Sequence, residues 1–329
     1  VGNLGYVMVA LIGSWLAIKG SIQVGEIQSF FQYIRNFTQP IQQIAQVSNM
    51  LQMTAAASER VFEFLDEEEE DQTVEHPVSV EGLKGNVQFD HVSFGYRPDK
   101  ITISDFSADV HEGQKIAIVG PTGAGKTTMI KLLMRFYDVN SGSIKVDGHD
   151  LREFNRNELR EMFGMVLQDT WLFNGSIMDN IRYGQLNATD EEVIEAAKAA
   201  HAHKFIKTLP GGYNMILNEE TSNISQGQKQ LLTIARAILA DPKILILDEA
   251  TSSVDTRTEI QIQKAMDNLM KGRTSFVIAH RLSTIRNADM ILVMKDGNII
   301  EQGSHEELMK KGGFYADLYN SQFIQDLSA

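Results

Sequence analysis

Cysteine is absent from the 329 residues of this chain, and basic side chains are fewer than acidic ones. The absence of cysteine excludes disulfides, thiol nucleophiles and thiolate metal sites. With 30 Lys and Arg against 43 Asp and Glu, the formal charge is -13. This charge argues against a nucleic-acid partner, because neutralising phosphates requires clustered Lys and Arg. A hydrophobic content of 43% is ordinary for a globular core, and the length suits two domains.

The N-terminal segment from Val1 to Ile18 carries no charge. Its length is the lower limit for a membrane-spanning helix. The segment lacks the basic leading region and the small-residue cleavage site of a signal peptide. A buried helix of a soluble protein is the remaining alternative. Because the chain begins with valine in the middle of an apolar run, we expect it to be part of a longer protein.

The next segment combines apolar residues at helical spacing with many glutamines. The apolar positions are Ile27, Phe30, Ile34, Phe37, Ile41 and Ile44, and the opposite face holds Gln32, Arg35, Gln39, Gln42, Gln43 and Gln46. This spacing predicts an amphipathic helix. A membrane helix that lines a watery path and a helix of a soluble bundle both fit the pattern.

An acidic run at residues 67–71, followed by His76 and Pro77, predicts a solvated linker and a domain boundary. From about residue 85 onward, short β-rich runs alternate with helical stretches. The clearest strands are residues 115–119, 143–146, 244–247 and 274–278. Strands that alternate with helices indicate an α/β domain with a largely parallel sheet.

A glycine-rich phosphate loop is the strongest motif. It consists of Gly120, Pro121, Thr122, Gly123, Ala124, Gly125, Lys126 and Thr127, and it fits the pattern G-x-x-x-x-G-K-[ST]. An apolar strand precedes it and a helical stretch beginning at Thr128 follows, which is the context that the motif requires. Glycines let backbone amides curl around phosphate oxygens, and the helix N-terminus adds partial positive charge. Lys126 is expected to reach the β- and γ-phosphates, and the Thr127 hydroxyl to bind magnesium.

Two neighbouring carboxylates, Asp248 and Glu249, end an apolar strand about 120 residues after the phosphate loop. Successive side chains of a strand point to opposite sides, so the two acids can take different tasks. In phosphate-loop enzymes the first acid holds magnesium, directly or through water. The second is then placed to polarise the attacking water.

Further residues follow in a recognisable order. They are Gln168, the segment Ile224-Ser225-Gln226-Gly227-Gln228, the acidic pair, the segment from Ser252 to Asp255, and His280. In this order the sequence resembles the ATP-binding cassette (ABC) family over about residues 85 to 325. Among its branches, it resembles the nucleotide-binding half of a bacterial multidrug-type exporter. The segment before the linker resembles the last two membrane helices of such a half-transporter.

The resemblance implies a fold, a domain division and cofactors. The fold is α/β, a phosphate-loop NTPase (RecA-like) with a mostly parallel sheet, an antiparallel β subdomain and a helical subdomain, preceded by an α-helical membrane segment. Residues 1–65 would form the C-terminal part of the transmembrane domain, residues 66–84 an acidic linker, and residues 85–329 the nucleotide-binding domain. ATP and Mg²⁺ are the implied cofactors, and a multi-pass position in the cell membrane with a cytoplasmic nucleotide-binding domain is the implied location.

The resemblance also implies roles for single residues. Tyr96 matches the aromatic residue that stacks on adenine, and Thr128 belongs to the nucleotide-binding set. Gln168 matches the residue that contacts magnesium and relays the nucleotide state to the membrane helices. Glu249 is the implied catalytic base. His280 matches the switch histidine that contacts the γ-phosphate. Asp255 matches the loop acid that communicates across a dimer.

In this family two cassettes sandwich two ATP molecules, and Ser225, Gly227 and Gln228 match the signature that contacts the partner's nucleotide. The usual signature is Leu-Ser-Gly-Gly-Gln, whereas Gln226 stands at a glycine position here. This substitution reduces conformational freedom and close approach of the backbone. We therefore hypothesise a heterodimer with a second half-transporter and one impaired ATP site. A homodimer that tolerates Gln226 is the alternative.

The leading functional hypothesis is an ATP-hydrolysing subunit that couples cassette closure to export of a drug, lipid or peptide across the membrane. A regulatory or mechanical ABC ATPase without transport is the alternative, although soluble members usually carry basic surfaces. An importer subunit is disfavoured, because importers usually keep the cassette on a separate chain. His201 and His203, two apart on an expected helix at residues 191–205, do not share a face and are not expected to bind metal.

Overall fold

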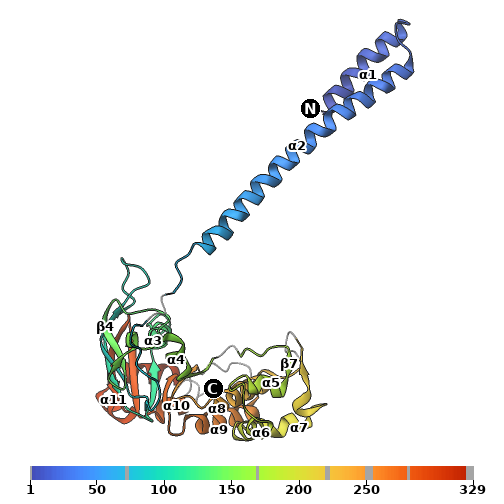
Figure 1. Ribbon diagram of the computed structural model, residues 1–329. Helices are drawn as coiled ribbons and strands as arrows, with labels where there is room; N and C mark the ends of the chain where they lie inside the picture. Colours follow the sequence, from blue (N-terminus) through green and yellow to red (C-terminus); the bar gives the residue numbers. More distant parts are fainter. Residues whose placement is uncertain are drawn as a thin grey trace. The chain divides into compact units, whose positions relative to one another are not determined.

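A helical hairpin precedes an α/β domain, and the two form separate compact units, Val1–Asp71 and Gln72–Ala329 (Figure 1). The computed structural model describes residues 2–70, 74–167, 170–218, 223–248, 255–279 and 282–323. The hairpin consists of α1 (Gly2–Ile18) and α2 (Val24–Leu65). Both helices confirm the helical segments expected from the uncharged run and from the apolar stripe.

Small residues shape the hairpin. Gly20, with a φ of 72°, lies in the turn between the helices. A Cβ atom on Gly13 would lie 3.1 Å from Cγ1 of Ile27, so the absence of a side chain permits the close approach of α1 to α2. Tyr6 of α1 stacks on Phe31 of α2 with ring centroids 5.7 Å apart.

Large apolar side chains of the hairpin are exposed. Along α2, the whole of which is described, no residue is buried, and Phe37 is 73% exposed. Within the described ranges, none of the helices combines the length and the apolarity that a membrane crossing requires. The position of the hairpin in a membrane stays a prediction.

In the described part of the α/β domain, the strands form three sheets. The six-stranded sheet has the order β12-β11-β3-β10-β9-β6, in which only β12 is antiparallel to its neighbour. Its strands are β3 (Lys115–Val119), β6 (Phe163–Val166), β9 (Ile244–Asp248), β10 (Thr274–Ile278), β11 (Met290–Lys295) and β12 (Asn298–Gly303). An antiparallel sheet of order β2-β1-β4-β5 contains β1 (Val87–Phe94), β2 (Ile103–Val110), β4 (Ser141–Val146) and β5 (His149–Asp150). The short strands β7 (Gly175–Ser176) and β8 (Ile216–Leu217) pair with each other.

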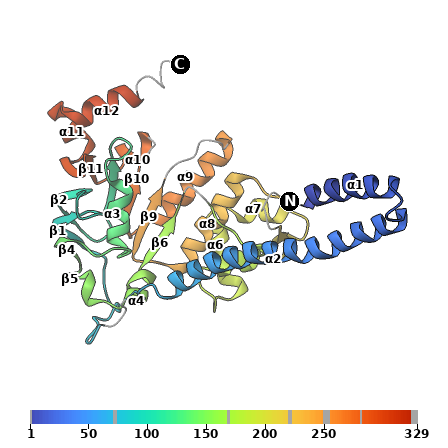
Figure 2. The same cartoon turned by 90° about the horizontal axis from the view of Figure 1, so that it is seen from above.

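Helices cover both faces of the six-stranded sheet, as Figures 1 and 2 show. The helices described in this domain are α3 (Lys126–Leu133), α4 (Arg156–Glu161), α5 (Ile177–Arg182), α6 (Asp190–Ala199), α7 (His203–Thr208), α8 (Gln226–Ala240), α9 (Thr256–Met270), α10 (Leu282–Arg286), α11 (His305–Lys311) and α12 (Phe314–Phe323), with 3-10 turns at Leu151–Glu153 and Gly212–Asn214. Successive side chains of a strand point to opposite faces of the sheet and therefore pack in different cores. Ile116 and Ile118 of β3 pack in one core with α3 and the antiparallel sheet, whereas Ala117 and Val119 pack in another with α11 and α12. A third core joins α5–α9 to β6, β9 and β10.

The fold class expected from the sequence is confirmed, and the four expected strands are present as β3, β4, β9 and β10. The prediction of a single helix at residues 191–205 is wrong. The chain forms α6 and α7 instead, and His201, with a φ of 56°, lies in the turn between them. A left-handed residue cannot continue a right-handed helix, which explains the break.

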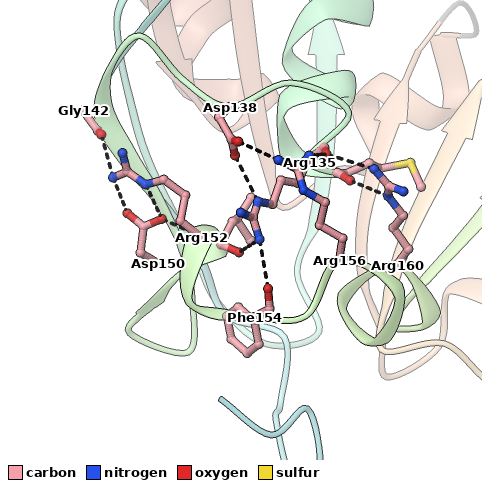
Figure 3. A network of polar contacts seen from close by, with 10 residues as sticks. Arg135, Asp138, Gly142, Asp150, Arg152, Phe154, Arg156 and Arg160 are labelled. Atoms are coloured by element: carbon pink, nitrogen blue, oxygen red, sulfur yellow. Dashed lines mark hydrogen bonds and ion pairs between the residues drawn. The ribbon is translucent and has the colours of Figure 1, made fainter. Parts of the chain in front are cut away.

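A buried network of arginines fixes the chain that follows α3 (Figure 3). Arg135 donates from Nη1 to the carbonyl oxygens of Leu151 and Phe154, at 3.0 and 2.9 Å. Its Nε donates to Asp138, and Nη2 of Arg156 donates to the other carboxylate oxygen of Asp138 at 2.7 Å. Two guanidinium groups therefore converge on one carboxylate, which holds residues 135–138 in place.

Asn180 links three segments of the helical part of the domain. It is fully buried, its Nδ2 donates to the carbonyls of Phe173 and Ser176, and its Oδ1 accepts from the amide of Phe173 and from Nη2 of Arg236. We expect Asn180→Leu to lower the free energy of unfolding by roughly 2–3 kcal/mol, because several buried polar groups lose their partner. The measurement is urea unfolding followed by tryptophan fluorescence. The exposed Asn187→Leu is the control; equal stability of the two variants would contradict this account of Asn180.

Candidate nucleotide-binding site

The phosphate loop joins β3 to α3, as the motif predicts. Gly125 caps α3 with a φ of 101°, a conformation that favours glycine. At Gly120 a Cβ atom would lie 2.2 Å from the carbonyl oxygen of Met294 in β11. Only glycine fits this approach, so β11 fixes the path on which the loop leaves the sheet. The result is a loop of backbone amides that ends at the N-terminus of a helix, an arrangement suited to phosphate.

The side chain of Lys126 bends back over the loop. Its Nζ donates to the carbonyl oxygens of Gly120 and Pro121, at 2.7 and 3.0 Å. Burial lowers the pKa of Lys126, and the nearby charge of Asp248 acts in the opposite direction. The ammonium group is thus bonded to two neutral acceptors at the loop, and the charge of Asp248 acts on it from nearby. Anionic oxygens are stronger acceptors for it than carbonyls are.

Strand register brings Asp248 to the same edge of the sheet as the phosphate loop. Ile278 of β10 pairs with Asp248 on one side and with Ile118 of β3 on the other. The carboxyl end of β9 therefore lies two strand positions from the start of the loop. Asp248 is partly buried, and its charge acts on Lys126. Gln168, Glu249 and His280, the three expected catalytic residues, lie outside the described residues.

Tyr96 lies against α3 and is 47% exposed. Its hydroxyl is 3.3 Å from Oγ1 of Thr128, a residue of the first turn of α3. Nζ of Lys131, one turn further, lies 5.7 Å from the centroid of the tyrosine ring. The structure thus brings Tyr96 to the helix that begins at the phosphate loop.

The signature residues begin α8, in a different core from α3. Ser225 is the N-cap: its Oγ accepts from the amide of Gln228, whose Oε1 accepts from the amide of Ser225. Gln226 is the first helical residue, a backbone conformation open to any residue type, and its Nε2 donates to Oγ1 of Thr170 at 3.2 Å. The substitution therefore acts through its side chain and not through backbone strain. Gly227 is buried in the first turn.

Asp255 is a helix N-cap in this structure. Its carboxylate accepts from the backbone amides of Arg257 and Thr258, at 3.1 and 3.0 Å. These bonds, that of Thr258 first, lower the pKa of Asp255. The role across a dimer that the resemblance implies remains a prediction.

Sequence reasoning did not select Tyr137, Asn140 or Lys131, although all three contact Tyr96 or its neighbours. Tyr137 and Asn140 follow α3 by only a few residues, but they meet residues 93–96 across more than forty residues of chain. Periodicity and spacing carry no signal for such a tertiary contact.

Together, the fold and the loop define a phosphate-loop nucleotide-binding domain, and comparison with known proteins agrees. A family model described as ABC transporter matches residues 103–252. A fatty acid ABC transporter ATP-binding/permease protein of Mycobacterium bovis is 53% identical over 315 residues, which are 96% of this chain and 50% of that protein. An ATP-dependent lipid A-core flippase of Desulfotalea psychrophila is 45% identical over 322 residues, which are 98% of this chain and 56% of that protein.

Among solved structures, a bacterial Atm1-family ABC exporter with ATP bound has a TM-score of 0.74 and 37% sequence identity, over 98% of this chain and 56% of that chain. The present chain belongs to the ABC transporter family, and its α/β domain is an ABC ATP-binding domain. It spans about half the length of the curated relatives that it matches.

Proposed function

We propose that this chain is the ATP-hydrolysing part of an ABC exporter. In this proposal, ATP binding and hydrolysis at the phosphate loop drive export of a small molecule, lipid or peptide across the cell membrane, with the ATP-binding domain in the cytoplasm. One observation carries the proposal: a phosphate loop and a strand-end carboxylate act on one lysine, Lys126. The similarity to exporters extends over the N-terminal hairpin as well, since it covers 98% of the chain.

The proposed site suits ATP together with magnesium. Magnesium prefers oxygen ligands and is commonly held by one or two protein groups and the phosphates of a nucleotide. In the described part of the chain there is no group of three or more His, Cys, Asp or Glu residues that could hold a metal alone. The Thr127 hydroxyl and the Asp248 carboxylate are hard oxygen donors of the right kind. When bound, the ion neutralises charge on the phosphates.

The residues then divide the work. The amides of the phosphate loop and the ammonium of Lys126 bind and orient the phosphates. Glu249, which directly follows Asp248, accepts a proton from the attacking water. Gln168 and His280 are proposed to contact magnesium and the γ-phosphate, respectively. Tyr96 stacks on the adenine base, which fixes the other end of the nucleotide.

Reconstitution tests the exporter proposal. The full-length protein, with its partner, is placed in lipid vesicles, and ATP hydrolysis and transport of labelled amphiphiles are measured together. Fatty acids and lipid A are the first compounds to try, because two relatives carry these substrates in their names. We expect ATP-dependent movement of at least one class of compound. A full-length protein that is soluble without detergent and hydrolyses ATP would instead favour a regulatory or mechanical ATPase.

We also propose that the partner is a second, different half-transporter. The support is Gln226, whose side chain stands where the family signature has glycine and reaches Thr170. The signature of one subunit completes the site of the other, so an altered signature impairs the partner's site. The partner is then expected to have an intact signature that completes the site of Lys126 and Glu249.

Co-purification of the full-length chain with the product of the adjacent gene tests the heterodimer. We expect a stable complex, with an ATPase rate well above that of this chain alone, and a rise in the rate of the chain alone on Gln226→Gly. Full activity of this chain without any partner would refute the heterodimer and establish a homodimer that tolerates Gln226.

A further inference from the structure

Three aromatic side chains, Phe94, Tyr96 and Tyr137, form one cluster beside α3. Phe94 is buried at 4% exposure, whereas Tyr96 and Tyr137 are 47% and 42% exposed. The ring centroids of Tyr96 and Tyr137 lie 5.1 Å apart with the ring planes at 90°, and Phe94 lies 5.0 Å from Tyr96 at 82°. These are the separations and angles of favourable edge-to-face pairs. Tyr96 therefore contacts two rings that are each nearly perpendicular to its own, and these two rings also contact each other, with the centroids of Phe94 and Tyr137 5.5 Å apart.

The backbone that carries Tyr96 is held by close contacts and hydrogen bonds of the turn to which it belongs. It belongs to a tight turn that leaves β1, in which a Cβ atom on Gly95 would lie 2.3 Å from the carbonyl oxygen of Lys100. The amide of Gly95 donates to Oδ1 of Asn140 at 2.7 Å, and the amide of Asn140 donates to the carbonyl of Ser93 at 3.0 Å. The segment 137–140 therefore contacts this turn in two ways. The ring of Tyr137 packs on Tyr96, and Asn140 forms hydrogen bonds with the backbone of the turn.

The segment 137–140 is itself fixed by the arginine network of Figure 3. Asp138, next to Tyr137, accepts from both Arg135 and Arg156. Arg135 is buried and has a φ of 52°, so the chain turns sharply from α3 into this segment. The network thus fixes the backbone on which Tyr137 stands, at the far end of the helix that begins at the phosphate loop.

We propose that Tyr137 is a positioning residue for the base of the nucleotide. It holds the ring of Tyr96 in the orientation on which a purine stacks, and the network of Arg135, Asp138 and Arg156 holds Tyr137. Because Tyr96 also contacts Thr128 and Lys131 of α3, the base platform and the phosphate loop form one preorganised unit. Preorganisation raises affinity by removing the cost of ordering the loop on binding. This inference rests on the proposed function, since it assumes a purine nucleotide at this site.

The test measures binding of ATP and of tripolyphosphate, which lacks base and ribose, to the full-length protein with Glu249→Gln to prevent turnover. We expect Tyr137→Leu to weaken ATP binding about 3- to 10-fold, the size of one lost aromatic pair. Tripolyphosphate binding should not change, which also shows that the variant is folded. Tyr137→Phe should bind ATP normally, because it keeps the ring. Phe136→Leu, an adjacent aromatic that packs under Arg160 and has similar exposure, is the matched control.

A double-mutant cycle separates positioning from direct contact. If Tyr137 acts through Tyr96, Tyr137→Leu has no further effect on ATP binding in a Tyr96→Leu protein. An undiminished effect in that protein, an equal loss with Tyr137→Phe, or unchanged ATP binding by Tyr137→Leu would each overturn the inference. If Tyr96→Leu itself leaves ATP binding unchanged, the proposed base site is wrong, and that failure is distinct from a failure of Tyr137 alone.

Discussion

Replacement of Glu249 by glutamine is expected to abolish turnover while ATP binding is retained. The amide cannot accept a proton from water, and general-base catalysis typically contributes about 10²- to 10⁴-fold to a rate. Glutamine has nearly the shape of glutamate, so the phosphate loop and Lys126 still bind the nucleotide. The steady-state ATPase rate and the equilibrium binding of ATP by the full-length protein are the two measurements. The rate should fall by this factor and the dissociation constant should change little.

A matched carboxylate serves as the control for Glu249. Glu191 is exposed in the first turn of α6, and Glu191→Gln should leave both rate and binding unchanged. Unchanged turnover in the Glu249→Gln protein would refute the assignment of Glu249 as the base. Loss of binding together with turnover would point to a role in holding the nucleotide.

Replacement of Lys126 by methionine should differ from Glu249→Gln, because it should weaken ATP binding itself. The ammonium group already lies at the loop, bonded to the carbonyls of Gly120 and Pro121. Hydrogen bonds between charged groups are worth about 1.5–3 kcal/mol each, so loss of two bonds to phosphate corresponds to about 100-fold or more in affinity. Lys126→Arg should also bind poorly, since a planar guanidinium differs from a compact ammonium in size and geometry.

The pH dependence of ATP binding provides a second readout on Lys126. Burial lowers the pKa of its ammonium group, so the group loses its proton at a lower pH than an ordinary lysine. Loss of this proton should therefore lower the ATP affinity as the pH rises through the pKa of Lys126. In Lys126→Met this alkaline decline should be absent.

The exposed Lys264→Met on α9 is the control for both measurements and should bind ATP as the unmodified protein does. If Lys126→Met binds ATP as tightly as the control does, the phosphate loop is not part of the nucleotide site. An alkaline decline that persists in Lys126→Met would assign the titration to another group.

The sequence determined most of the framework of this domain, because the signals concerned are local. An apolar run followed by the glycine-rich motif gives β3 and the loop after it, and another apolar run that ends in two acidic residues places Asp248 at the end of β9. Spacing of apolar residues predicted a helix over residues 27–44, and the structure extends it to Val24–Leu65 as α2. The single helix expected at residues 191–205 was wrong because the Ala-rich sequence favours helix throughout, whereas the left-handed turn at His201 divides the segment into α6 and α7, which share one core with α8.

Only the tertiary structure decided which residues meet. The register of β9, β10 and β3 brings Asp248 to the loop of Lys126, and this depends on the pairing of β10 with β3, which are more than a hundred residues apart in the chain. The contact of Tyr137 with Tyr96, and the network of Arg135, Asp138 and Arg156 behind it, likewise join segments through packing and buried hydrogen bonds. Local sequence sets backbone preference and motif chemistry, whereas long-range contacts result from the whole core and leave no periodic pattern in the sequence.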